Sequence, residues 1–237
     1  MPTTNEAHII VPLELAQPRR YEREPNVAGA LASAQEDRYA ALDEIAQRVL
    51  RRLSVFEGDF TLEAACDVVS CGAIERLDVP AGIAALWSCS FLQLADGEYS
   101  RVRYFLSRAT RAFASGKLIR HGERDLVARN HARYLQCMLE YAEVEFDRRE
   151  PGRWMACYTN LLGEVRAALD WAFSPAGDAS LGVDLTMAGI PLWLLSSQAD
   201  ELQRRIGRAL KSEAAVAHSG RQMRLRSAAR LAGMTDI

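Results

Sequence analysis

The fold of this 237-residue chain is decided by residues 48–69, which read RVLRRLSVFEGDFTLEAACDVV. Apolar residues in and before this stretch recur every three or four positions, which predicts one buried helix face ended by Gly58. They are Leu42, Ile45, Ala46, Val49, Leu53 and Phe56. Thr61 can cap a second helix through Val69, because its hydroxyl can accept a hydrogen bond from a first-turn amide. Two short helices joined by a tight break are therefore expected.

A third helix and a β-hairpin come next. Asp78 and Pro80 are typical of a helix start, and the apolar pattern continues to about Ser90. Residues 91–94 and 99–103 are two strand candidates joined by an Asp-Gly turn. Three helices followed by a hairpin is the order of a winged helix-turn-helix, so we expect a winged-helix-like domain over residues 38–118.

The rest of the chain is predicted to be helical. Candidate helices cover 104–115, 123–146, 153–173, 180–196, 200–218 and 221–231, with breaks that include Gly116. Long helices joined by short loops pack as antiparallel neighbours, and helix pairs of this size build solenoids of the tetratricopeptide (TPR) type. The expected fold class is mainly α: the winged-helix-like module, then an antiparallel TPR-like bundle over residues 119–237.

The first 37 residues differ in composition from the rest of the chain. Four of the eight prolines lie there, mixed with charges, and no helical period is sustained. Such a composition is typical of an extended or disordered leader.

Composition excludes several classes of protein. The chain has 29 Lys and Arg against 31 Asp and Glu, and 49% of its residues are hydrophobic, which excludes collagen-like, supercharged and disulfide-scaffold proteins. Five cysteines without a CxxC pair are expected to be reduced and buried. A secretory signal and an apolar run of about 20 residues are both missing from the sequence, so we expect a cytoplasmic protein without a membrane segment.

Several stretches together resemble one known family. These are residues 48–69; GIAALWSCSFLQLADGEYSRVRYFLSRATRAFASGK (82–117); ERDLVARNHARYL (123–135); RWMACYTNLLGEVRAALDWAF (153–173); and PLWLLSSQADELQRRIGRAL (191–210). Their order and spacing are similar to the winged-helix and TPR-like arm of bacterial STAND (NB-ARC-type) ATPase transcriptional regulators, of the AfsR/SARP-like and LuxR-like kinds. The resemblance implies a role in bacterial signal transduction or transcription regulation.

The chain departs from that family in one respect. The family's ATPase core needs a glycine-rich loop ending in Gly-Lys-Ser/Thr, and the nearest string here, Ser115-Gly116-Lys117-Leu118, lacks the first glycine and the hydroxyl. We interpret it as the C-terminal cap of a helix. The resemblance therefore implies the arm of such a regulator without its ATPase, with no cofactor of its own, and it makes another regulator or an ATPase a candidate partner.

Signs of catalysis are weak. The four histidines are scattered, with neither an HExxH motif nor a His/Cys pair at metal-ligand spacing, and there is no GxSxG elbow. His131 shares a helix face with Val127 and Leu135, so a ligand or proton-transfer role competes with a core histidine bonded to a carbonyl. We favour the core histidine, and we expect neither an enzyme nor a metal site.

DNA binding is the main functional question, because winged helices commonly place their third helix in the major groove. Residues 79–90 carry no Arg, Lys, Asn or Gln, the side chains that contact bases and phosphates. Arg101 and Arg103 on the hairpin could touch phosphates as a wing does, or could instead solvate the wing or contact a protein. We favour the second interpretation.

Basic residues also gather near the end of the chain, where residues 204–230 hold eight of them against Glu213 alone. The candidate contact residues here are Arg204, Arg205, Arg208, Arg224 and Arg226. Three interpretations stay open: solvated outer faces of amphipathic helices, a surface for an acidic protein, and a nucleic-acid surface. Met223, Leu225 and Leu231 could form an apolar edge that packs on a partner or on a second copy of the chain.

The sequence thus predicts a non-enzymatic regulatory or adaptor protein that acts by protein–protein contact. The alternative is a winged-helix transcription regulator that contacts DNA through its wing and its basic C-terminal helices.

Overall fold

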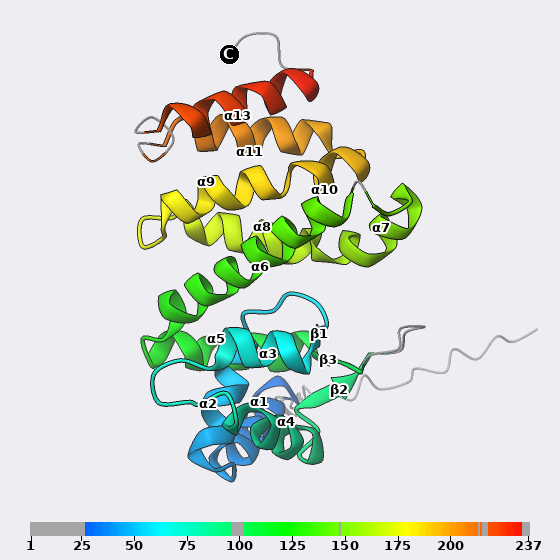
Figure 1. The fold of residues 1–237 in the computed structure, drawn as a ribbon. Coiled ribbons are helices and arrows are strands. Elements are labelled where there is room, and N and C mark those ends of the chain that lie inside the picture. The colour runs from blue at the N-terminus through cyan, green and yellow to red at the C-terminus, as the bar shows by residue number, and fades with distance from the viewer. Residues whose placement is uncertain (1–26, 96–101, 147, 213, 215–217, 234–237) are drawn as a thin grey trace, which may run out of the picture. The chain divides into compact units, whose positions relative to one another are not determined.

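The structure is a computed structural model that describes residues 27–95, 102–146, 148–212, 214 and 218–233, and the fold is mostly helical (Figure 1). The chain divides into two compact units, residues 1–38 and 39–237. The α-helices and the 3₁₀ helix η1 are α1 (Val27–Ala40), α2 (Glu44–Leu53), α3 (Leu62–Val69), α4 (Asp78–Ser88), α5 (Arg108–Arg120), α6 (Arg124–Phe146), α7 (Pro151–Tyr158), η1 (Thr159–Leu161), α8 (Leu162–Ala172), α9 (Ala179–Ala188), α10 (Ile190–Leu195), α11 (Ala199–Leu210) and α13 (Ser219–Leu231).

Helix α1 corrects the prediction of an extended or disordered leader over residues 1–37. Residues 27–37 are helical, and residues 1–26 lie outside the described part. The segment VAGALASAQEDRYA is rich in alanine, the residue with the highest helix propensity, but it has no apolar stripe. A search for helical periodicity therefore misses it.

The first two helices of the predicted winged-helix region begin at side-chain caps. Asp43, which the sequence analysis did not single out, accepts a hydrogen bond from Ala46 N at 2.7 Å and begins α2. Thr61 accepts one from Ala64 N at 3.2 Å and begins α3, as predicted. Helix α4 then packs against α2 so closely that a Cβ on Gly82 would lie 2.8 Å from Val49 Cγ2. The glycine is what allows the two helices to approach this far.

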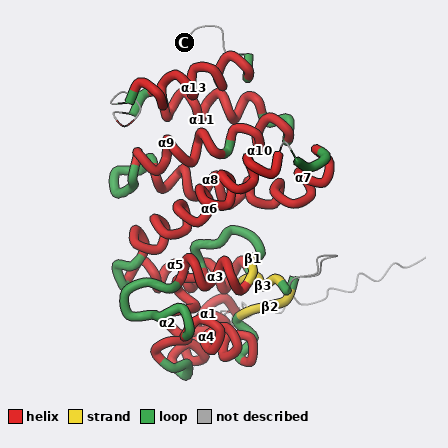
Figure 2. Tube along the Cα trace, in the orientation of Figure 1, coloured by secondary structure: helices red, strands yellow, loops and turns green. Residues whose placement is uncertain are grey.

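A small antiparallel sheet completes this region (Figure 2). Its strands are β1 (Phe60–Thr61), β2 (Leu92–Leu94) and β3 (Arg103–Leu106), in the order β1-β3-β2. The two-residue strand β1 is too short to show a pattern in the sequence, and it pairs Phe60 with Tyr104.

The second strand and the helix after it lie further along the chain than predicted. Strand β3 occupies residues 103–106, while residues 99–101 of the predicted strand 99–103 lie outside the described part. Helix α5 starts at Arg108 instead of Tyr104, because Ser107 caps it by accepting from Thr110 N at 3.1 Å. The expected turn at residues 95–98 falls mostly outside the described residues. The break predicted at Gly116 is wrong, since α5 runs through it to Arg120.

Helix α5 ends at Arg120, and the turn after it contains Gly122, whose φ of +67° is a backbone conformation that glycine tolerates best. Glu123 N donates to Leu118 O at 3.2 Å, the six-to-one hydrogen bond of a Schellman cap. This turn reverses the chain and places Glu123 immediately before α6.

The remaining helices confirm a helical C-terminal region, with two breaks that the sequence prediction missed. The predicted helix 153–173 is interrupted by η1, and the predicted helix 180–196 is interrupted at Gly189. Pro191 lies in the first turn of α10, and a Cβ on Gly189 would lie 2.2 Å from the Trp193 ring. The predicted helix 200–218 corresponds to α11, which is shorter and ends at Leu210. The predicted helix 221–231 corresponds closely to α13.

Residues 39–237 contain two hydrophobic cores. One joins α2, α3, α4, β2 and α5 and reaches Val127 in the first turns of α6, and the other begins at Ala128 and continues to Ala232. Helix α6 therefore contributes to both. The domain boundaries at residues 37/38 and 118/119 stay predictions.

The predicted burial of the five cysteines is correct for Cys66 and wrong for the three that are exposed. Cys66 is buried and Cys71 is half-buried, whereas Cys89, Cys137 and Cys157 are exposed. Each of those three lies among apolar neighbours in the sequence but points away from the buried face. Among the described residues, no helix combines the length and the apolar character that crossing a bilayer requires.

Candidate functional site

Helix α4, the third helix of the winged-helix region, has one buried and one exposed face. Val79, Gly82, Ile83 and Leu86 are buried. We call the exposed set Leu77, Pro80, Ala81, Ala84 and Trp87 the α4 surface. Trp87 is 55% exposed and Leu77 is 86% exposed.

The α4 surface carries no charged side chain. Asp78, the one charged residue of α4, lies in the first turn and accepts a hydrogen bond from Glu75 N at 2.9 Å, so it serves the start of the helix. Base readout in the major groove depends on Arg, Lys, Asn, Gln and acidic side chains that can reach base edges. The exposed face of this helix therefore offers van der Waals and apolar contact instead of base or phosphate recognition.

Of the two wing arginines, Arg101 lies outside the described residues. Arg103 is engaged within the fold: its Nε is 2.7 Å from Asp59 Oδ2, and its guanidinium also donates to Asp59 O at 2.9 Å. This bidentate contact ties β3 to the residue before β1. Arg103 would have to leave Asp59 in order to bind a phosphate.

Four of the eight basic residues at 204–230 form ion pairs with other described residues: Arg205, Arg208, Arg221 and Arg224. Arg205 is 2.5 Å from Asp170 and 3.4 Å from Glu201, and Arg208 is 3.8 Å from the same Asp170. Arg208 also donates to Phe173 O at 2.9 Å. Arg205 and Arg208 of α11 thus both contact Asp170 near the C-terminal end of α8, and these contacts connect the two helices.

The three other predicted contact residues in this part are more exposed. Arg224 on α13 lies 3.4 Å from Glu143 of α6. Arg204 and Arg226 are exposed, and neither forms an ion pair with any other described residue. They are the two predicted basic contacts here that remain free for an acidic or nucleic-acid partner. Of the three residues in the predicted apolar edge, Leu225 is buried, whereas Met223 and Leu231 are exposed.

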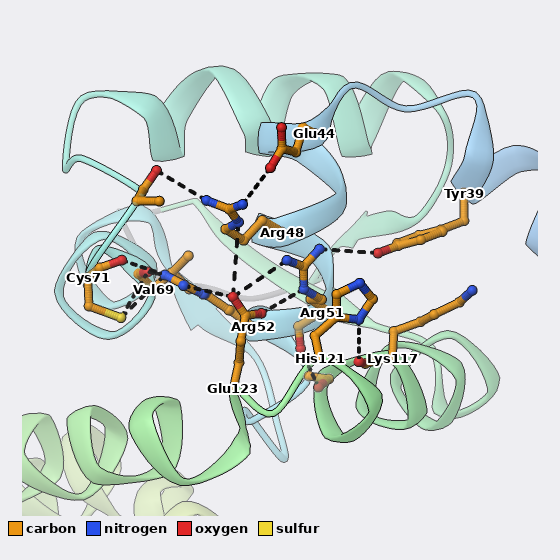
Figure 3. A network of polar contacts seen from close by, with 12 residues as sticks. Tyr39, Glu44, Arg48, Arg51, Arg52, Val69, Cys71, Lys117, His121 and Glu123 are labelled. Atoms are coloured by element: carbon orange, nitrogen blue, oxygen red, sulfur yellow. Dashed lines mark hydrogen bonds and ion pairs between the residues drawn. The ribbon is translucent and has the colours of Figure 1, made fainter.

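A cluster of charges connects α2 to the start of α6 (Figure 3). Glu123 Oε2 lies 2.6 Å from Arg51 Nε, and Glu123 Oε1 lies 2.9 Å from Arg52 on the same helix. Arg52 also donates to the backbone carbonyls of Val69 and Cys71 at 2.8 and 2.9 Å. One carboxylate thus holds two buried arginines, and we call Arg51, Arg52 and Glu123 the junction cluster.

Burial and charge act in opposite directions in the junction cluster. Burial alone would raise the pKa of Glu123, but hydrogen bonds from Arg51 and Arg52 lower that pKa below its ordinary value. Burial would lower the pKa of Arg51, yet its bonds to Glu123 and to the Tyr39 hydroxyl, 3.3 Å away, raise the pKa instead. Arg51 and Glu123 therefore both stay charged at neutral pH, and their ion pair connects α2 to the residue before α6.

A second buried pair lies further along α6. His131 Nε2 is 3.0 Å from Glu164 Oε2 of α8, and Glu164 Oε1 accepts a hydrogen bond from Gly58 N at 2.6 Å. Burial would raise the pKa of Glu164, but His131 and the backbone amides of Glu57 and Gly58 together lower it. His131 is thus a core histidine, as expected, but its partner is a carboxylate instead of the expected carbonyl.

The sequence analysis missed the buried charges Arg51, Arg52 and Glu164 and the half-buried Glu123. Arg52 follows Val49 by three positions, and Glu164 precedes Ala168 by four, so each lies on an otherwise apolar helix face. A charge placed on an apolar stripe signals a buried partner, because an unpaired buried charge is very costly. That signal could have found Arg52 and Glu164, while Glu123 lies in a turn and has no such pattern.

No three His, Cys, Asp or Glu side chains in the described ranges are arranged to hold a metal ion.

Comparison with known proteins identifies one part of the chain. Residues 42–119 match the family described as Winged helix-turn-helix domain. No curated protein and no solved structure matches the chain at a significant level. The match covers α2 to α5 and the three-stranded sheet, the same elements that form the first hydrophobic core. The chain therefore contains a winged helix-turn-helix domain at residues 42–119.

Proposed function

We propose that this protein is a non-enzymatic regulatory or adaptor protein whose winged-helix domain contacts another protein instead of reading DNA. The observation that carries the proposal is the uncharged α4 surface. A helix that reads DNA needs basic and amide side chains on its exposed face, whereas this one exposes Trp87 between small apolar residues. An exposed tryptophan within an apolar patch is typical of a protein interface.

The junction cluster supports a role in regulation. Because Glu123 fixes α2 to the start of α6, the winged-helix domain and the helical region are held to each other by charges with little exposure to water. A partner bound on the α4 surface would therefore be placed at a defined position relative to α6. Such an arrangement suits a protein that brings two other components together.

The resemblance to STAND regulators suggests the class of partner. In those regulators the winged-helix arm follows an ATPase domain, and this chain has no phosphate-binding loop. An ATPase or another regulator is the partner that we propose, in cytoplasmic bacterial signal transduction or transcription regulation.

One observation favours a second candidate function. The family match is to a winged helix-turn-helix domain, and domains of this kind commonly bind DNA. Arg204 and Arg226 are exposed without ion pairs among the described residues and could contact phosphates. DNA binding through the wing and the basic C-terminal helices is therefore the alternative.

Fluorescence anisotropy with a labelled duplex of random sequence separates the two functions. Non-specific DNA binding usually shows a Kd of roughly 10⁻⁴ to 10⁻⁶ M that rises steeply with salt. We expect weaker binding than this and no difference between the native chain and Arg204→Ala/Arg226→Ala. Micromolar binding that weakens with salt, and that this double substitution reduces, would establish the DNA-binding alternative.

A further inference from the structure

Helix α13 packs against α9 and α11 with one face and exposes the opposite face (Figure 1). Its buried residues Leu225, Ala228 and Ala229 lie on one side of the helix, as 3.6 residues per turn requires. The residues on the other side are all exposed, and we call them the α13 surface: Met223, Arg226, Ser227, Arg230 and Leu231.

The α13 surface contains two large apolar side chains. Met223 is 70% exposed and Leu231 is 75% exposed. They are eight positions apart with Ser227 halfway between them, so all three lie along one line on successive turns of the helix. A second helix that lay along this line would remove both apolar side chains from water.

The charges on α13 are all positive. The helix has four arginines and no acidic residue. Arg221 pairs with Asp184 of α9 at 2.6 Å, and Arg224 pairs with a carboxylate of α6. Arg226 and Arg230 are exposed and form no ion pair with any other described residue. The α13 surface therefore presents two uncompensated positive charges beside its apolar side chains, and these charges attract carboxylates.

The neighbouring helices show how this chain joins one helix to another. The apolar faces of α11 and α13 are both buried in the second hydrophobic core. Ion pairs accompany this burial: Arg205 of α11 lies 2.5 Å from Asp170 of α8, and Arg221 of α13 reaches Asp184 of α9. The α13 surface has the apolar side chains and the arginines of such a contact and lacks only the carboxylates.

We propose that the α13 surface binds an acidic amphipathic helix of another protein. The apolar stripe of that helix covers Met223 and Leu231, and its carboxylates pair with Arg226 and Arg230. The α13 helix of a second copy does not fit, because it would bring the same positive charges against them. A nucleic-acid backbone would pair with the arginines but would leave the two apolar side chains in water. The α13 surface and the α4 surface lie on different helices, so neither proposal depends on the other.

Fluorescence anisotropy with labelled peptides tests the proposal on the full chain. The probe is about three copies of the repeat Glu-Leu-Ala-Ala-Leu-Glu-Ala, in which carboxylates flank an apolar stripe when the peptide is helical. Two matched peptides carry Gln or Lys at the Glu positions. We expect the Glu peptide to bind about three- to tenfold more tightly than the Gln peptide, and this preference should shrink as salt is added. The Lys peptide should not bind.

Three variants and one control locate the binding surface. Arg226→Gln/Arg230→Gln should abolish the preference for the Glu peptide, and Arg226→Glu/Arg230→Glu should reverse it in favour of the Lys peptide. Leu231→Ala should weaken the Glu and Gln peptides alike, by about tenfold, because less apolar area is buried. The matched control Arg124→Gln/Arg133→Gln removes two exposed arginines of α6 and should leave peptide binding unchanged. All of these side chains are exposed, so the variants are expected to fold.

Three results with the peptides would overturn the proposal. The first is an affinity for the Glu peptide within twofold of that for the Gln peptide. The second is binding of the Glu peptide that Arg226→Gln/Arg230→Gln leaves unchanged. The third is no saturable binding of the Glu peptide up to about 1 mM, which is weaker than the affinity of a specific contact.

Two further results would assign the α13 surface to a different partner and so also overturn the proposal. One is a dimer in light scattering that Leu231→Glu dissociates, which would make a second copy the partner. The other is binding of a random DNA duplex, in place of the Glu peptide, that Arg226→Gln/Arg230→Gln abolishes.

Discussion

The replacement Glu123→Ala removes the carboxylate that holds Arg51 and Arg52. Both arginines are about 5% exposed or less, so each would keep a buried charge without its ion pair. Breaking a buried pair typically costs about 3–5 kcal/mol. Arg52 retains two backbone carbonyls and Arg51 retains the Tyr39 hydroxyl, which puts the expected loss at about 3 kcal/mol.

That loss corresponds to a fall in Tm of about 6–12 °C for a unit of this size. Urea denaturation followed by circular dichroism measures the free energy of unfolding directly. The matched control is Glu44→Ala, which removes an exposed α2 carboxylate paired with Arg48 at 2.5 Å and should cost less than about 1 kcal/mol. If Glu123→Ala costs no more than Glu44→Ala, the junction cluster does not hold the two regions together.

Other predictions address the cap, the acid limit and the α4 surface. Gly122→Ala should lower the free energy of unfolding by about 1 kcal/mol, because alanine disfavours a φ of +67°. Gly116→Ala lies inside α5 and should raise the free energy of unfolding by about 0.5–1 kcal/mol. Thermal denaturation of both variants tests whether the two changes in stability have opposite signs. Folding lowers the pKa of Glu164 and the pKa of Glu201, which is paired with Arg166. The free energy of unfolding should therefore be constant above about pH 5 and fall as the pH drops below about 4.3. A Glu164→Gln chain should lose less of its stability over that acid range, and an identical pH profile would contradict the assignment. Trp87→Ala should change the unfolding free energy by less than about 1 kcal/mol, because the ring is 55% exposed; a larger loss in a urea titration would show that Trp87 is part of the core.

The sequence predicts the elements that depend on local chemistry. The cap at Thr61 predicts the start of α3, and the apolar face predicts α2, although α2 ends at Leu53 instead of reaching Gly58. The order of helices and hairpin leads to the winged helix-turn-helix domain. It does not predict β1, because two residues carry no period and Phe60 becomes a strand only by pairing with Tyr104. It also misses α1, whose alanine-rich sequence has no apolar face.

The candidate sites show the same division. The uncharged exposed face of α4 follows from its sequence alone, since the residue types decide what it can recognise. The pairing of Arg103 with Asp59 and that of Arg205 with Asp170 join residues 44 and 35 positions apart, and nothing in the local pattern selects these partners. The α13 surface is defined by which residues of α13 the neighbouring helices bury, so only the folded chain reveals it.

The central claim is that the α4 surface binds a protein. A photo-crosslinking amino acid placed at position 87, with position 141 on α6 as an equally exposed control, tests it most directly in cells that naturally contain the protein. We predict a covalent adduct with one defined protein at position 87, absent at position 141 and lost when Ala84→Glu adds a charge to the surface. Two results would contradict the claim. One is an adduct with DNA at position 87, and the other is the lack of any protein adduct at position 87 that Ala84→Glu abolishes.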